Sequence, residues 1–154
     1  MALRILIVGA GAVGGYFGGR LAQAGRDVTF LVRPSRAKQL SRDGLRIISP
    51  HGDAVLSPKL ISADKIDAPY DIIFLSVKAY ALEAAMNDFA AAVGPETMIF
   101  PVLNGMRHID ILTKTVRRTC GHRRRLSRRG RDRPPGSHRP ARRLSATCLW
   151  REKW

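Results

Sequence analysis

A glycine-rich turn near the start of the chain constrains its fold more than any other feature. Residues 3–8 read LRILIV, an almost uninterrupted apolar run that is typical of a parallel strand buried on both faces. The turn that follows reads GAGAVG over residues 9–14, and residues 12–24 have the spacing of a helix that ends at Gly25. A strand, a GxGxxG turn and a helix in direct succession predict a site for the phosphates of a dinucleotide.

Each glycine of this turn has a separate predicted task. Gly9 permits the tight turn, Gly11 lets the backbone approach a pyrophosphate, and Gly14 lets the helix pack closely on the strand. The free N–H groups and the dipole of the helix N-terminus then hold the phosphates. The predicted cofactor-binding residues of the turn are Gly9, Ala10, Gly11, Ala12, Val13 and Gly14.

Strands and helices alternate along the chain after this turn. Further strands are predicted over residues 27–32, 45–48, 54–56, 71–77 and 97–100, and helices over 35–43, 80–93 and 107–112. In the first helix, the predicted apolar face consists of Phe17, Leu21 and Ala24. The alternation favours a parallel sheet, so the predicted fold class is α/β, with a Rossmann-type doubly wound parallel sheet that is incomplete.

The end of the second strand indicates which nicotinamide cofactor the turn would bind. An aspartate or glutamate at this point binds the ribose 2′-hydroxyl of NAD and repels a 2′-phosphate. This chain has Arg33 instead, and the planar guanidinium of arginine can pair with a phosphate. NADP (NADPH) is therefore the predicted cofactor, and nearby Arg36 could share the role of Arg33. The alternative is that Arg33 is a solvated surface arginine.

Two further polar residues follow strands at the same predicted edge of the sheet. Lys78 follows the strand 71–77, and Asn104 follows the strand 97–100. In open α/β sheets, ligands bind beyond the carboxyl ends of the strands. A lysine offers a positive charge to a carboxylate or phosphate, and an asparagine offers both a donor and an acceptor. From the residues alone, a solvated lysine and an ordinary Asn-Gly turn are equally good interpretations.

The order of these motifs resembles that of the ketopantoate reductases (2-dehydropantoate 2-reductases). The motifs that carry the resemblance are GAGAVG, Leu31-Val32-Arg33, Val77-Lys78-Ala79 and Asn104-Gly105-Met106, and it covers residues 1 to about 114. The resemblance implies hydride transfer from NADPH to ketopantoate, a small 2-oxo acid, which gives pantoate for pantothenate biosynthesis.

The resemblance also implies roles for single residues. The arginine matching Arg33 contacts the 2′-phosphate of NADP, and the residues matching Lys78 and Asn104 face the nicotinamide and the substrate. The family's catalytic lysine lies in a helical C-terminal domain, and no segment of this chain resembles that domain. No catalytic residue is therefore assigned in this chain, which we expect to be a truncated, inactive cofactor-binding fragment.

Most of the net charge of +15 lies in the last part of the chain. Residues 1–114 carry 13 Lys or Arg and 10 Asp or Glu, whereas residues 115–154 carry 14 and 2. The second segment has almost no apolar periodicity up to residue 143, so it cannot bury enough surface to offset the entropy of ordering it. We predict an NADP-binding domain over residues 1–114 and a disordered, arginine-rich tail over residues 115–154.

Runs of arginine are also what GC-rich coding DNA gives when it is read in the wrong frame. Residues 115–125, moved by one base, permit a helix end and a buried strand that resemble the family's next segment. Residues 135–154 permit a hairpin with the family's Tyr-Gly-Glu in the same way. We therefore expect the tail to be an out-of-frame translation that follows one extra base near Lys114.

Two other functions remain open at the level of sequence. One is a related NAD(P) dehydrogenase that acts on another 2-oxo acid or on a 3-hydroxy acid, and Asn104-Gly105-Met106 argues against it. The other is nucleic-acid binding through the clustered arginines of the tail. The tail has no recognised nucleic-acid-binding motif, so we expect non-specific binding only.

Several other classes are disfavoured by simple features of the chain. The apolar run over residues 3–8 is too short for a signal sequence or a membrane span. Cys120 and Cys148 match neither a metal-ligand spacing nor a disulfide framework. We therefore expect a cytoplasmic protein without a metal site or a membrane partner.

Overall fold

A computed structural model describes residues 3–103, 108 and 111–112 of the chain. Asn104-Gly105-Met106 and the tail over residues 115–154 lie outside the described residues, so their predicted roles stay predictions. The predicted helix over residues 107–112 is described at three positions, all helical, and Leu112 is buried in the core.

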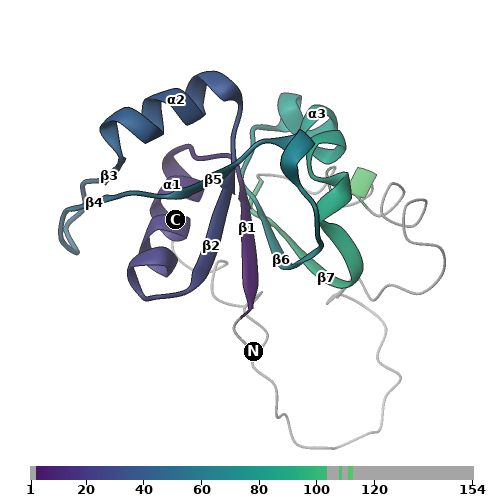
Figure 1. The fold of residues 1–154 in the computed structure, drawn as a ribbon, viewed down its shortest axis with the longest axis horizontal. Helices are drawn as coiled ribbons and strands as arrows, with labels where there is room; N and C mark the ends of the chain where they lie inside the picture. Colours follow the sequence, from purple (N-terminus) through teal and green to yellow (C-terminus); the bar gives the residue numbers. More distant parts are fainter. Residues whose placement is uncertain (1–2, 104–107, 109–110, 113–154) are drawn as a thin grey trace, which may run out of the picture.

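Five parallel strands form the central sheet of the described part of the chain (Figure 1). In spatial order they are β5 (Lys59–Ile61), β2 (Asp27–Leu31), β1 (Arg4–Val8), β6 (Tyr70–Leu75) and β7 (Val93–Pro101). Along the chain, the sheet grows from β1 to one side and then to the other, so the order reverses between β1 and β6. This is the order of a doubly wound sheet, and the predicted α/β fold class is confirmed.

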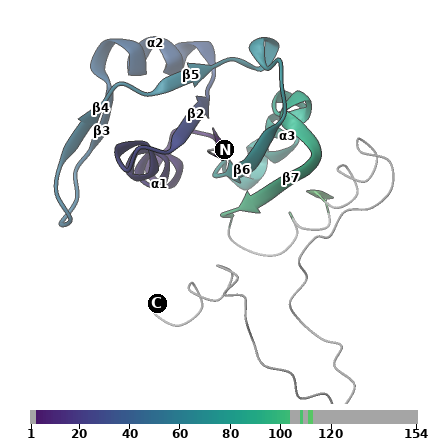
Figure 2. The same cartoon turned by 60° about the horizontal axis from the view of Figure 1, so that its bottom comes forward.

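Helices cover both faces of this sheet. Helices α1 (Ala12–Gln23) and α2 (Pro34–Asp43) lie on one side, and α3 (Leu82–Asp88) lies on the other (Figure 1). A small antiparallel hairpin of β3 (Leu45–Ile47) and β4 (Ala54–Leu56) extends away from the main sheet on the side of α1 (Figure 2). Three single turns of 3-10 helix complete the described elements: η1 (Ala63–Lys65), η2 (Ala79–Ala81) and η3 (Ala90–Ala92).

Strand β1 is buried on both faces, as its apolar sequence predicts. Leu6 and Val8 pack in the core on the side of α3, whereas Ile5 and Ile7 pack in the core beneath α1 and α2. Side chains alternate along a strand, so an uninterrupted apolar run is needed to fill both layers.

The structure corrects the predicted helix over residues 80–93 and the strand that follows it. The segment is divided into η2, α3 and η3, and β7 begins at Val93 rather than at residue 97. Phe89, the C-cap residue of α3, and Ala92 are both buried in the core, so tertiary packing outweighs the helix propensity of the alanines here. Gly94 lies inside β7, where a side chain would press against Pro69.

The edge strand β5 was not predicted from the sequence. It pairs with β2 over three residues, and Lys59 binds the carboxylate of Asp27 at 2.8 Å. The hydrogen bond from Lys59 lowers the pKa of Asp27. A strand of three residues is too short to show an alternating pattern of apolar side chains. Its partner β2 also lies about thirty residues away along the chain, so no local hairpin signal marks the pairing.

Helix α1 packs on the sheet through glycines, which corrects part of its predicted apolar face: Leu21 packs against the core as predicted, whereas Phe17 and Ala24 are exposed. Its buried residues are Gly14, Gly15, Gly18 and Gly19, whereas Phe17 is 43% exposed. A Cβ atom at Gly18 would lie 2.8 Å from Ile7 Cγ1 and from the ring of Phe30. The helix therefore lies closer to the sheet than larger side chains would allow.

We expect Gly18→Ala to lower the free energy of unfolding by about 1–3 kcal/mol, because the added methyl group overpacks the contact with Ile7 and Phe30. Gly15→Ala is the matched control in the same helix, since its Cβ would lie 3.4 Å from Leu45 Cδ1, an ordinary contact. Alanine favours a helix by up to about 1 kcal/mol over glycine, so this control should be neutral or stabilising. Urea denaturation measures both effects, and an equal change in the two variants would contradict close packing at Gly18.

Candidate functional site

Four loops leave the sheet at the carboxyl ends of neighbouring strands, where the strand order reverses. They begin at Gly9 after β1, Val32 after β2, Ser76 after β6 and Val102 after β7. Backbone hydrogen bonds join the first three: Gly9 N donates to Leu31 O at 3.3 Å, and Ser76 N donates to Val8 O at 3.0 Å. The structure thus brings the glycine turn together with the segments that carry Arg33 and Lys78. This edge is where ligands bind in doubly wound sheets.

The three glycines of the turn occupy different surroundings. Gly9 has a φ angle of 94°, a conformation that favours glycine. A Cβ atom at Gly14 would overlap the carbonyl oxygen of Gly9 and the hydroxyl of Ser76. A Cβ atom at Gly11 would have no atom within 4 Å. Gly14 is therefore needed for packing inside the protein, whereas Gly11 leaves room for a group that approaches from outside.

Helix α1 begins directly after Gly11, so its first N–H groups belong to the glycine turn. Gly11 is the N-cap residue and provides no side-chain cap, and the first turn contains no acidic residue. The first N–H groups of any helix lack acceptors within the helix. Together with the positive end of the helix dipole, these groups can bind an anionic phosphate.

Two side chains from other elements bind carbonyl oxygens next to this turn. The hydroxyl of Ser76 lies 3.0 Å from Val8 O and 2.9 Å from Gly9 O. Arg36 in α2 donates from Nη2 to Ala10 O at 3.1 Å. Neither contact was predicted, because each joins residues that are far apart in the sequence. The sequence offered Arg36 as a second phosphate ligand, and the structure places its guanidinium on the backbone of the turn.

Arg33 and Lys78 are exposed at this edge of the sheet. Arg33 is the N-cap residue of α2, and Lys78 is the N-cap residue of η2. Within the described part of the chain, neither side chain takes part in a hydrogen bond or an ion pair. Both cations are therefore available to an anionic ligand, and Asn104, the last of the predicted site residues, lies outside the described residues.

No three histidine, cysteine, aspartate or glutamate side chains among the described residues lie close enough together to hold a metal ion. Among the described helices, none has the length and apolar character that crossing a bilayer requires.

Comparison with known proteins gives consistent matches to one family. A family model described as ketopantoate reductase PanE/ApbA matches residues 5–127. The uncharacterized oxidoreductase YkpB of Bacillus subtilis is 46% identical over 110 residues, which cover 71% of this chain and 36% of that protein. The 2-dehydropantoate 2-reductase of Mesorhizobium japonicum is 33% identical over 107 residues, which cover 68% of this chain and 32% of that protein. The chain spans about a third of the length of these relatives.

Solved structures with the same fold include enzymes with two different names. The 2-dehydropantoate 2-reductase of Geobacter metallireducens is 30% identical, with a TM-score of 0.66, over 77% of this chain and 40% of that chain. A ternary structure of D-mandelate dehydrogenase with NADH and anilino(oxo)acetate is 28% identical, with a TM-score of 0.66, over 73% of this chain and 37% of that chain. Together with the strand order, these likenesses confirm the Rossmann-type fold.

We expect Ser76→Ala to lower the free energy of unfolding by about 1 kcal/mol, because it removes a partly buried hydroxyl from the carbonyl oxygens of Val8 and Gly9. Ser57→Ala serves as the control, since Ser57 is exposed and lies away from the turn, and it should change stability by less than about 0.5 kcal/mol. Chemical denaturation of the two variants provides the comparison. Indistinguishable midpoints would show that Ser76 does not support the turn.

Proposed function

This chain belongs to the ketopantoate reductase family, and we propose that it supplies the cofactor-binding part of an NADPH-dependent 2-dehydropantoate 2-reductase. The proposed reaction is hydride transfer from NADPH to 2-dehydropantoate, which gives pantoate for pantothenate biosynthesis. The observation that carries the proposal is the open glycine turn at the start of α1, with exposed Arg33 at the end of the neighbouring strand. The proposed cofactor-binding residues are Gly9, Ala10, Gly11, Ala12, Val13, Gly14, Arg33, Lys78 and Asn104.

The turn fits the pyrophosphate of a dinucleotide. The position of a Cβ atom at Gly11 is open, and the first N–H groups of α1 have no competing side-chain cap. A phosphate there gains hydrogen bonds to the backbone and a favourable interaction with the helix dipole. When bound, the cofactor supplies the hydride, and the role of these residues is to hold and orient it.

The choice of NADPH over NADH depends on Arg33 in this proposal. D-mandelate dehydrogenase has the same fold in this region, and its structure contains NADH. The fold alone therefore accommodates a nicotinamide dinucleotide without selecting the phosphorylated form. A guanidinium at the end of β2 adds a partner for the 2′-phosphate, which NADH lacks.

Lys78 is the described residue best placed to bind a 2-oxo acid substrate. It follows β6, beside the strand that leads into the glycine turn, and its side chain is exposed. An ammonium group there can attract the carboxylate of the substrate and the polarised carbonyl oxygen beside it. The family resemblance implies that the residue matching Asn104 also faces the substrate.

A second candidate function is the reduction of a different 2-oxo acid by the same kind of chemistry. The likeness to D-mandelate dehydrogenase favours it, as does the similarity to an oxidoreductase that is uncharacterized. The described residues provide the cofactor edge, whereas the part of the relatives that this chain does not match can decide the shape of the substrate pocket. The two candidates therefore differ in substrate and agree on the cofactor site.

We expect the 154-residue chain to bind NADPH at least about 10-fold more tightly than NADH, because hydrogen bonds to a charged group contribute roughly 1.5–3 kcal/mol. Arg33→Ala should remove this preference while leaving the affinity for NADH nearly unchanged. Arg42→Ala, which removes an exposed arginine that pairs with Asp43, is the control for net charge. Isothermal titration calorimetry with both nucleotides measures the four values. Equal affinities in the unaltered chain, or an unaltered preference in Arg33→Ala, would contradict the assignment.

We also expect the 154-residue chain to bind NADPH without reducing 2-dehydropantoate. The resemblance places the family's catalytic lysine in a C-terminal domain, and the chain matches about a third of its relatives. The proton donor that hydride transfer to a carbonyl requires should therefore be missing. The absorbance of NADPH, followed with and without 2-dehydropantoate, tests this expectation. Substrate-dependent oxidation well above background would show that the matched third suffices for the reaction.

A further inference from the structure

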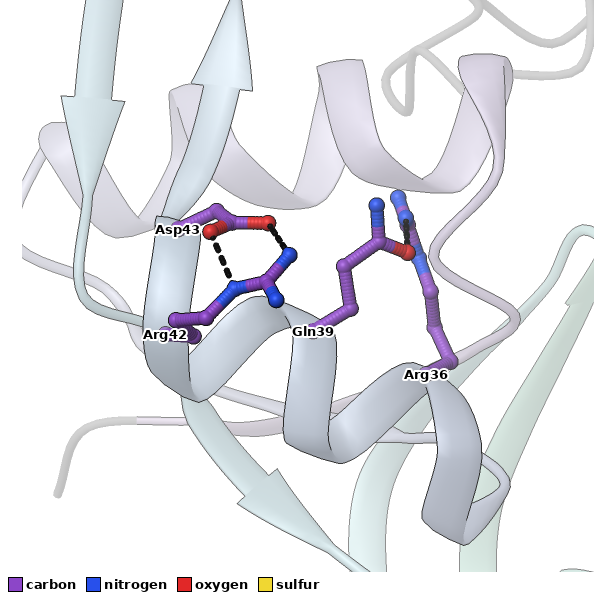
Figure 3. A network of polar contacts seen from close by, with 4 residues as sticks. All are labelled: Arg36, Gln39, Arg42 and Asp43. Atoms are coloured by element: carbon purple, nitrogen blue, oxygen red, sulfur yellow. Dashed lines mark hydrogen bonds and ion pairs between the residues drawn. The ribbon is translucent and has the colours of Figure 1, made fainter.

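Arg36 connects the first turn of α2 to the glycine turn that precedes α1. Its Nη2 donates to Ala10 O at 3.1 Å, and its Nη1 donates to the side-chain oxygen of Gln39 at 2.7 Å. Figure 3 shows the Gln39 amide against the guanidinium on one side of α2. The residue is partly buried. The guanidinium is therefore held from two directions, and one of its partners is the backbone of the predicted phosphate-binding turn.

The contact determines the orientation of one peptide group in the turn. A trans peptide is planar, so its C=O and N–H groups point in opposite directions. The carbonyl of Ala10 and the N–H of Gly11 belong to the same peptide. When Arg36 holds the carbonyl on the side of α2, the N–H of Gly11 is turned to the opposite side.

The other carbonyl groups of this segment are held in a comparable way. Those of Val8 and Gly9 lie within hydrogen-bond distance of Ser76, and that of Gly11 accepts from Gly15 N at 2.7 Å. Among the carbonyl groups of residues 8–11, only that of Ala10 would lose its hydrogen-bond partner if Arg36 were removed. That peptide could then rotate and present its oxygen, rather than an N–H group, to an approaching phosphate.

Arg36 and Arg33 differ in the partners that they already have. Binding a phosphate through Arg36 would compete with its hydrogen bonds to Ala10 and Gln39. Arg33 is exposed, and within the described residues its side chain makes no such bonds. Of the two arginines at the start of α2, Arg33 is therefore free to bind a ligand, whereas Arg36 holds the backbone of the glycine turn.

We propose that Arg36 is a positioning residue for the dinucleotide, acting through the Ala10–Gly11 peptide without contacting the cofactor. The inference rests on the proposed function, because it assumes that the turn binds the pyrophosphate. NADPH and NADH share that pyrophosphate. Arg36 should therefore support both nucleotides equally, whereas Arg33 distinguishes between them.

The test compares the affinities of both nucleotides in variants of the 154-residue chain. Arg36→Met keeps the aliphatic stem but removes the donors, so its packing is largely retained. We expect it to weaken NADPH and NADH by the same factor, about 5- to 30-fold, because the released Ala10–Gly11 peptide no longer presents its N–H group to the pyrophosphate. The lost internal hydrogen bond should also lower the melting temperature by a few degrees. Arg36→Lys retains a donor and should recover part of the affinity for both. Arg42→Ala is the matched control: Arg42 lies on the same helix, is exposed and pairs with Asp43 (Figure 3), and its loss should change neither affinity.

Each other outcome has a distinct meaning. A loss of NADPH affinity alone in Arg36→Met would show that Arg36 binds the 2′-phosphate, and no loss of either affinity would show that its contact with Ala10 is dispensable. Both results overturn the inference. If Arg36→Met does not fold, Arg36→Lys decides: weaker binding of both nucleotides at an unchanged ratio supports the inference, and any other result overturns it. An unaltered chain that binds neither nucleotide contradicts the proposed function itself, and this inference with it.

Discussion

The contact between helix α1 and strand β1 is the constraint on which the rest of the site depends. The helix has glycines where it meets the sheet, and a Cβ atom at Gly14 would overlap the carbonyl oxygen of Gly9. About one turn further along the helix, Gly18 lies against Ile7 and Phe30 with no room for a methyl group. This close approach brings the first N–H groups of the helix to the end of the central strand. A larger residue at these positions would move the helix away and take its positive end out of the site.

A close approach alone does not determine which way the peptide groups of the turn face. That orientation comes from contacts with elements that lie elsewhere in the chain, namely Ser76 after β6 and Arg36 in α2. Both bind carbonyl oxygens, so the N–H groups remain available to a ligand. The neighbouring segments thus have two tasks, because they complete the fold and they also hold the loop that follows β1. The site is therefore a property of the assembled sheet rather than of the glycine motif alone.

The sequence predicted those features whose signal is local. The apolar run of β1, the GxGxxG turn and the strands β2 and β6 can be read from short windows, and the family resemblance drawn from motif order is confirmed. The features that were missed depend on tertiary contacts. Strand β5 is a short edge strand, and α3 ends at Asp88, directly before Phe89, whose side chain is buried in the core. Phe17 was expected to face the core, but the glycines occupy that side of α1 because only they allow the helix to approach the sheet. The role of Ser76 also has no local signature, since its partners lie 67 and 68 residues away.

The same reasoning explains why cofactor choice and cofactor binding can be controlled by different residues. On the proposed assignment, the backbone of the turn interacts with the pyrophosphate, which every nicotinamide dinucleotide contains, so the geometry of the turn cannot distinguish between them. A likeness in fold to a D-mandelate dehydrogenase whose structure contains NADH is consistent with this generality. Selectivity requires a group that reaches the ribose of the adenosine half, at the end of β2, where this chain has Arg33. On the proposed assignment, a substitution at Arg33 could change the preferred cofactor without altering the turn, because its side chain makes no hydrogen bond to the turn in the described structure. A substitution at Arg36 would instead disturb the turn itself, and binding of either cofactor would suffer.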